Sequence, residues 1–101
     1  MARIVWTEQS AQDLEHIAEY IALGSVKYAK LTVRKIRTSA NVLKQQPLTG
    51  RIVPEINSNE IRELIIGNYR LIYQVQGTQV TILTVHHSAR LLKADTFLPE
   101  T

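Results

Sequence analysis

Apolar residues recur along this chain with a helical period in its first half and a strand period in its second half. A short apolar strand over residues 3–6 precedes the first helical segment. Thr7 can begin this helix, and so can Ser10, which has Asp13 three residues later as in a capping box. The apolar side chains of the helix follow at spacings of three and four residues, which places them on one face: Ala11, Leu14, Ala18 and Ile21. The pattern therefore predicts a strand followed by an amphipathic helix.

A second helix is predicted directly after the first. Gly24 suits the left-handed position that ends a helix, and Ser25 can cap the next one. The apolar residues that follow repeat for about five turns, until Pro47 stops the helix: Val26, Ala29, Val33, Ile36, Ala40 and Leu43. One residue after each of them stands a polar, mostly cationic residue: Lys27, Lys30, Arg34, Arg37, Asn41 and Lys44. The second helix is thus predicted to carry a cationic stripe beside its apolar seam.

Three strands are predicted beyond a loop or irregular edge strand around residues 51–53. They are rich in Ile, Leu, Tyr and Val, and Gly67-Asn68 and Gly77-Thr78 are turn signals between them. The three segments are residues 60–66, 69–76 and 79–87. Strand, helical hairpin and antiparallel meander together predict an α+β fold of two layers, with the hairpin on one sheet face and the other face open. The length predicts one domain, residues 1–101.

Composition excludes several classes of protein. The chain contains no cysteine, which removes disulfides, thiolate metal sites and cysteine nucleophiles. No histidine or acidic pair has metal-ligand spacing, so we expect neither a metal nor another cofactor. No apolar run reaches the roughly 7–15 residues of a signal-peptide core or the ~20 residues of a membrane helix. We therefore expect a cytoplasmic protein with no membrane partner.

Positive charge is concentrated in the middle of the chain. Lys and Arg number 12 against 9 Asp and Glu, which gives a net charge of +3 at pH 7. No acidic residue lies between Glu19 and Glu55. That window contains seven of the cations: Lys27, Lys30, Arg34, Lys35, Arg37, Lys44 and Arg51. A locally basic surface of this kind predicts an acidic or phosphate-bearing partner.

Several short motifs, taken in order, resemble those of ParE-type toxins of the RelE/ParE superfamily, and the likeness covers most of the chain. Ala11-Gln12-Asp13-Leu14, Ile17 and Tyr20-Ile21 are similar to the first helix of these toxins. The segment after the second helix contributes Pro47, Gly50-Arg51 and Pro54-Glu55. The closing strands contribute Ile61-Arg62-Glu63-Leu64, Tyr69-Arg70-Leu71-Ile72-Tyr73 and His87-Ser88-Ala89-Arg90. The order and spacing of these motifs carry the resemblance.

The resemblance implies a toxin from a type II toxin–antitoxin operon, bound in a hetero-oligomer by a cognate acidic antitoxin. ParE-type members inhibit DNA gyrase, whereas RelE-type members cleave mRNA on the ribosome. We expect a ParE-like gyrase inhibitor that performs no chemistry of its own. The alternative is a RelE-like, ribosome-dependent mRNA endonuclease. A third hypothesis is a relative that only binds its antitoxin and regulates its operon.

The endonuclease alternative needs a base, an acid and cations around one phosphate. Its candidate residues are Glu55, Arg62, Arg70 and His87, with Tyr73, His86 and Arg90 as further possible members. RelE-like enzymes usually carry a catalytic tyrosine or a dense set of Lys and Arg near the end of the last strand. Here that region reads His87-Ser88-Ala89-Arg90-Leu91-Leu92, without tyrosine. This departure favours binding over catalysis.

Partner binding is predicted for seven cations: Lys27, Lys30, Arg34, Arg37, Arg62, Arg70 and Arg90. Each also has a purely structural interpretation. A cationic stripe on a helix is most often a solvated face, and Arg62 and Arg70 are consistent with pairing to Glu55, Glu60 or Glu63 across the sheet. Arg90 can bond backbone carbonyls or a partner carboxylate. Adjacent His86 and His87 must point to opposite faces of their strand, so only one of them can face a given site.

Overall fold

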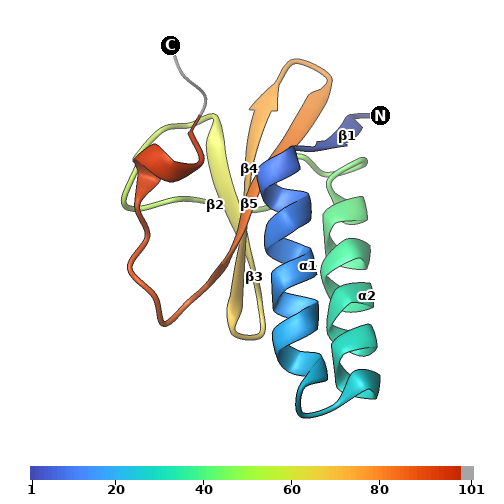
Figure 1. Cartoon of the computed structure of the whole chain (residues 1–101). Coiled ribbons are helices and arrows are strands. Elements are labelled where there is room, and N and C mark those ends of the chain that lie inside the picture. Colours follow the sequence, from blue (N-terminus) through green and yellow to red (C-terminus); the bar gives the residue numbers. More distant parts are fainter. Residues whose placement is uncertain (99–101) are drawn as a thin grey trace.

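The computed structural model describes residues 1–98, which form one sheet and a helical hairpin (Figure 1). In chain order the elements are β1 (Arg3–Trp6), α1 (Glu8–Ala22), α2 (Val26–Val42), β2 (Arg51–Ile52), β3 (Ile61–Ile66), β4 (Tyr69–Gln76), β5 (Gln79–His87) and the 3-10 helix η1 (Ala94–Thr96). This order confirms the predicted α+β fold. Within the described range, none of the helices combines the length and apolar character that crossing a membrane requires.

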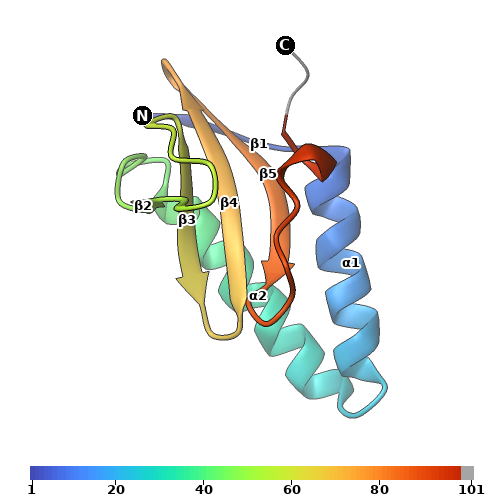
Figure 2. The same cartoon turned by 90° about the vertical axis from the view of Figure 1, so that its left-hand side faces the viewer.

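The sheet has the strand order β1-β5-β4-β3-β2. All neighbouring strands are antiparallel except β1 and β5, which are parallel. The helical hairpin returns the chain to the end of the sheet at which β1 begins, and the two following hairpins give β5 the direction of β1. Figure 2 shows α1 and α2 together on one side of the sheet. The β1–β5 pairing covers only Gln79–Ile82, so β5 continues past the end of β1.

The main core lies between the hairpin and the sheet. Leu71 and Tyr73 of β4 point to this face and are fully buried. The remaining buried members come from both helices and the neighbouring strands: Leu14, Ile36, Ala40, Leu43, Ile66, Val80, Ile82 and Val85. Only the second half of the predicted seam of α2 enters this core fully, since Val26 is 59% exposed. Val26 is therefore left at the surface, whereas Ala29 is buried outside this core and Val33 is partly buried against it.

The opposite sheet face is not open, contrary to the prediction. Ile72 and Leu83 point to that side and form a second buried cluster with Val53 and Ile61. The loop after β2 and the segment after β5 cover the cluster through Ile56, Leu92, Phe97 and Leu98. The reason is that the central strands carry apolar side chains on both faces, which is typical of strands buried on both sides. Residues 91–101 carry few sequence signals, which predicts either a short helix or a loose end; the short helix η1 forms within this segment, and residues 99–101 lie outside the described residues.

Helix α1 begins after Thr7. The Thr7 side chain accepts a hydrogen bond from the Ser10 amide at 3.1 Å and donates one to the carbonyl of Ile82 at 2.9 Å. The alternative start at Ser10 is wrong, because Ser10 is buried inside the first turn and its hydroxyl donates back to the Thr7 carbonyl. Asp13 is consequently free from a capping role. Its carboxylate bonds β5 instead.

The turn between the helices differs from its predicted geometry. Gly24 does not adopt a positive φ; the positive-φ glycines of the described chain are Gly67 and Gly77, in the two hairpin turns. Helix α1 ends instead with the amides of Gly24 and Ser25 both donating to the carbonyl of Ile21. Ser25 caps α2 as predicted, accepting a hydrogen bond from the Tyr28 amide at 3.0 Å. The helices can therefore follow each other closely.

Candidate functional site

Arg70 is held by two carboxylates on the sheet face away from the helices. Its Nη1 and Nη2 donate to the two carboxylate oxygens of Glu55 at 2.8 Å each, and its Nε donates to Oε1 of Glu63 at 2.5 Å. The hydrogen bond from Arg70 lowers the pKa of Glu55 from 4.5 to about 2. The same bond is the main cause that raises the pKa of Arg70. Arg70 is thus already fully engaged within the chain.

Glu63 is the buried centre of this network. Its side chain is fully buried, and its second oxygen accepts a hydrogen bond from Nε of Arg51 on β2 at 2.7 Å. A buried carboxylate is tolerated here because two guanidinium groups offset its desolvation. We call Arg51, Glu55, Glu63 and Arg70 the carboxylate clamp. The structural interpretation of Arg70, a pair with Glu55 and Glu63, is confirmed.

Arg62 lies on the other face of the sheet from Arg70. In register it stands opposite Tyr73, on the helix side, and its Nη1 donates to the carbonyl of Gly50 at 3.0 Å. The Gly50 amide donates in turn to the Tyr73 hydroxyl at 2.9 Å, and burial raises the pKa of that phenol. Arg62 therefore holds the segment after α2 against the sheet, and makes no pair with Glu55, Glu60 or Glu63.

His87 stands at the far end of β5, on the helix side. It is opposite Tyr69, and the two rings meet edge to face with centroids 5.4 Å apart. His86 is opposite Arg70 in the register, and its Nε2 lies 2.9 Å from the carbonyl oxygen of Arg90. The adjacent histidines thus occupy alternate faces, as strand geometry predicts.

The four residues of the endonuclease alternative do not converge. Arg62 and Arg70 are separated by the sheet, and Arg70 is neutralised by Glu55, a second member of the set. Arg62 and His87 share the helix side, but their partners on β4 are four residues apart, roughly 13 Å at strand rise. No position in the described chain therefore lies within contact of all four side chains.

The cationic stripe of α2 borders an apolar groove on the outer surface of the hairpin. Lys30, Arg34 and Arg37 line this groove, whose volume is about 660 Å³, whereas Lys27 is exposed outside it. The apolar lining comes from both helices: Ala18, Ala22, Val26, Ala29 and Val33. The groove lies over the start of the α2 seam, where Val26 is exposed. We refer to it as the hairpin groove.

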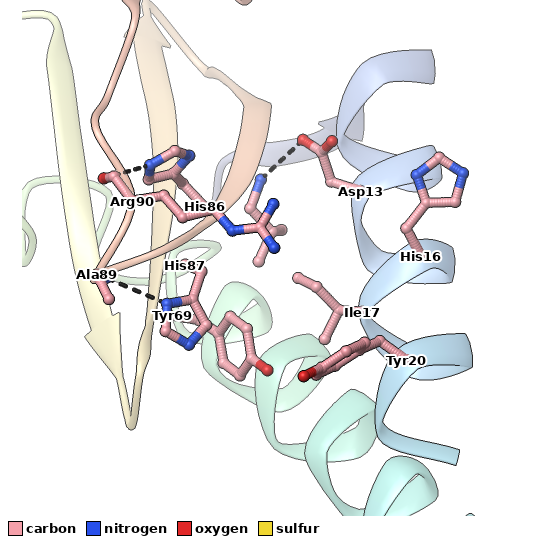
Figure 3. Close-up of a pocket in the computed structure, with 10 residues that line it drawn as sticks. Asp13, His16, Ile17, Tyr20, Tyr69, His86, His87, Ala89 and Arg90 are labelled. Carbon is pink, nitrogen blue, oxygen red and sulfur yellow. Dashed lines mark hydrogen bonds between the residues drawn. The ribbon is translucent and has the colours of Figure 1, made fainter. Parts of the chain in front are cut away.

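A second cavity lies where α1 passes the end of β5, and we call it the β5 cleft (Figure 3). Its volume is about 530 Å³. Helix α1 contributes Asp13, His16, Ile17 and Tyr20, β4 contributes Tyr69, and the end of β5 with the following turn contributes Val85, His86, His87, Ala89 and Arg90. Of these, the sequence analysis names His86, His87 and Arg90 as candidates. It does not identify Asp13, His16, Tyr20 and Tyr69 as members of a site.

The missing signal lay in the helical spacing of α1. Asp13, His16, Ile17 and Tyr20 are three, four and seven residues apart, so they share one face. The apolar stripe that predicts the helix lies on a neighbouring face, and an interpretation of the helix based on that stripe alone does not identify this polar face as part of a site. In residues 1–98 no three side chains of His, Asp and Glu are grouped for a metal ion. The β5 cleft is lined mainly by aromatic, histidine and arginine side chains, with Asp13 at its edge.

The chain matches a known family over most of its length. A profile described as "ParE toxin of type II toxin-antitoxin system, parDE" matches residues 4–92. Among curated proteins, Toxin RelE2 of Caulobacter vibrioides is 33% identical over 92 residues, which cover 90% of this chain and all of that protein. The range matched by the profile includes both helices and all the strands except Arg3, the first residue of β1.

Two solved structures share the fold. The chromosomal ParDE toxin–antitoxin system from P. aeruginosa aligns with a TM-score of 0.72 at 24% identity, over 86% of this chain and 96% of that one. The toxin–antitoxin complex RelBE2 from Mycobacterium tuberculosis aligns with a TM-score of 0.55 at 23% identity, over 85% of this chain and 96% of that one. Together with the profile match, these likenesses place the chain in the ParE toxin family of type II toxin–antitoxin systems, within the RelE/ParE superfamily.

Proposed function

We propose that this toxin acts by binding DNA gyrase and is neutralised by a cognate antitoxin. The observation that carries the proposal is the carboxylate clamp. Arg70 lies near the start of β4, in the sequence that resembles the superfamily motif, yet its guanidinium is occupied by Glu55 and Glu63. A cation that is already paired has little left to offer a scissile phosphate.

The separation of the other candidates supports the same proposal. General acid–base cleavage requires the base, the acid and the cations within hydrogen-bond reach of one phosphate. Arg62 is turned to the Gly50 carbonyl, and His87 packs against Tyr69. With its candidates on two faces of the sheet, the chain is better suited to binding than to RNA cleavage. On this proposal the toxin is not an enzyme and works in the cytoplasm.

An antitoxin partner is supported by the relatives and by the hairpin groove. The two solved relatives are described as toxin–antitoxin systems or complexes. The hairpin groove has an apolar lining with Lys30, Arg34 and Arg37 at its border. An amphipathic helix with acidic flanks would bury its apolar face in such a groove and pair its carboxylates with these cations. Lys27, outside the groove, would contribute through long-range attraction alone.

The test adds purified, antitoxin-free toxin to two reactions in parallel: gyrase supercoiling with ATP, and cell-free translation with primer extension on the mRNA. We expect loss of supercoiling, accumulation of linear DNA and intact mRNA. Arg70→Ala is a poor probe because it also breaks the clamp, so His87→Ala and Arg62→Lys are the informative variants. Both should retain gyrase inhibition.

The opposite result would establish the endonuclease alternative, which is consistent with the name of the relative from Caulobacter vibrioides, Toxin RelE2. In that result, wild-type toxin cuts mRNA in the ribosomal A site and leaves gyrase activity unaffected, and the His87→Ala variant no longer cleaves the mRNA. Absence of both activities, together with no growth inhibition on expression without the antitoxin, would leave only the role of an antitoxin-binding regulator.

A further inference from the structure

The hairpin groove continues beyond the first half of α2. A second cavity of about 500 Å³ shares Ala18, Val33 and Arg37 with the groove and reaches Trp6 at the end of β1. Helices α1 and α2 run side by side over this distance, as Figure 1 shows. The two cavities together follow the hairpin from Val26, near its turn, to Trp6. The hairpin therefore carries one long depression with an apolar floor between its two helices.

The two walls of this depression carry opposite charges. Helix α1 contributes Glu15 and Glu19, and helix α2 contributes Lys30, Arg34 and Arg37. All five side chains are exposed. Within residues 1–98 none of them forms an ion pair, because every ion pair of that range belongs to the carboxylate clamp. The charges of an acidic wall and a basic wall are thus left for a partner.

A second copy of the chain is complementary to both walls. When two copies are related by a rotation of 180° about an axis along the groove, α1 of each copy lies on α2 of the other at the same height. Glu19 lines the groove together with Lys30, and Glu15 lines its continuation together with Arg37. Each glutamate would therefore face a cation of the other copy. An acidic helix of another protein would use the basic wall alone.

The helices of such a pair form a standard architecture. Because α1 and α2 are antiparallel within a hairpin, the rotation makes all neighbouring helices antiparallel, as in an up-down four-helix bundle. Helix α2 has 17 residues, so the shared surface is about 25 Å long and, with two helices side by side, about 20 Å wide. Roughly 1,000 Å² in total would be covered, which corresponds to a weak dimer with a dissociation constant on the order of 10 μM.

We propose that the hairpin groove is the self-association surface of the free toxin, where two copies join their hairpins into a four-helix bundle through Glu15–Arg37 and Glu19–Lys30 pairs. A regulatory consequence follows, which rests on the function proposed above. An antitoxin helix that occupies the groove separates the two copies. Toxin that is released without antitoxin pairs with itself once its concentration exceeds the dissociation constant of the dimer.

Sedimentation equilibrium of full-length, antitoxin-free toxin tests the self-association directly. Wild-type toxin should change from monomer to dimer over a concentration series on either side of about 10 μM. Glu19→Lys and Lys30→Glu should each weaken the dimer at least about tenfold, because each change places two like-charge pairs in one dimer. The control Lys35→Glu makes the same charge change on α2 outside the groove and should change the dissociation constant less than about threefold.

A mixture of the two single variants tests the predicted pairing. In a dimer of one Glu19→Lys copy and one Lys30→Glu copy, the first is positive at both positions and the second is negative at both. Both pairs are then attractive, so an equimolar mixture should dimerise about as strongly as wild type. A mixture as weak as its components, a wild type that stays monomeric, or equal constants for all variants would overturn the proposal. Circular dichroism and unfolding midpoints exclude misfolding as the cause.

The separation by antitoxin has its own test. The chain contains no cysteine, so Val26→Cys introduces a single thiol beside the groove. A short bismaleimide should link two copies of the free variant, and an excess of the protein encoded by the adjacent reading frame should abolish the link. Persistent linking in the complex would overturn this separation. None of these measurements involves gyrase, so a toxin without effect on gyrase would refute the proposed function while sedimentation still decides self-association.

Discussion

Arg70 and Arg90 belong to the same end of the sheet, where β4 begins and β5 ends, and their surroundings are opposite. Arg70 is largely buried and bound by two carboxylates, whereas Arg90 is exposed and free of any carboxylate in the described chain. Both are embedded in motifs shared with the same toxin superfamily. The difference shows that the number of cations in a segment does not by itself locate a binding surface. The positions of the carboxylates decide which cations are already paired and which are available to a partner.

The strongest test of this contrast removes the centre of the carboxylate clamp. Glu63→Ala leaves the guanidinium of Arg70 without its buried partner, and the free energy of unfolding should fall by about 3–5 kcal/mol. Urea denaturation measures it, with Glu60→Ala as the control, since Glu60 is an exposed carboxylate that forms no ion pair within residues 1–98. Equal losses in the two variants would mean that the clamp has no special role in stability.

A substitution at Gly50 tests how tightly the residues beside the carboxylate clamp are packed. A Cβ at this position would lie 2.5 Å from the Tyr73 hydroxyl and 2.6 Å from the Glu63 carbonyl oxygen. Gly50→Ala should therefore destabilise the protein by about 1–3 kcal/mol, as overpacking does. Gly24→Ala is the matched control, because its nearest neighbour is 3.7 Å away. A thermal melt that ranks Gly24→Ala below Gly50→Ala would contradict this packing.

Glu55, a member of the carboxylate clamp, makes the free energy of unfolding depend on pH. Its pKa is lowered from 4.5 to about 2 in the folded state, so its contribution is present above pH 4.5 and is lost as the pH falls toward 2. Because Glu55 is half exposed, Glu55→Gln should cost about 0.5–1 kcal/mol at pH 7.

The measurement for Glu55 is the urea midpoint of wild type and Glu55→Gln between pH 7 and pH 2. The difference between them should shrink through the acidic range and vanish near its lower end. A difference that stays constant over this range would show that Glu55 acts by packing rather than by its charge.

Arg90 should contribute least to stability. Arg90→Ala removes no ion pair of the described chain, so its unfolding free energy should stay within about 0.5 kcal/mol of wild type. Substantial destabilisation, measured by the same urea titration, would mean that Arg90 belongs to the fold and would remove the contrast with Arg70.

Most of the fold was predictable from local patterns. The helical spacing of apolar residues and the turn signals at Gly67-Asn68 and Gly77-Thr78 placed both helices and the meander, because these features act over a few residues. The wrong predictions concern positions at which contacts with an element distant in the sequence determine the local structure. Ser10 is a good cap by its chemistry, but Thr7 is preferred because it also bonds the carbonyl of Ile82 on β5.

The candidate site was predictable only in part. His86, His87 and Arg90 were named because they stand out in an apolar strand, and they do line a cleft. Arg62 and Arg70 were grouped because both lie on strands, but their register places them on opposite faces. Asp13, His16 and Tyr20 were missed because nothing local indicates that their face of α1 meets the end of β5.

The sequence by itself determined the elements, the α+β class, the superfamily resemblance and the inventory of cations. Those properties depend on composition and on spacings within one element. The tertiary structure alone decided which cations are free. Glu55 and Glu63 neutralise Arg70 from a distant loop and a neighbouring strand, and α1 turns the end of β5 into a cleft with Arg90 at its border. Charge pairing and burial depend on distances in space, which residue order does not contain.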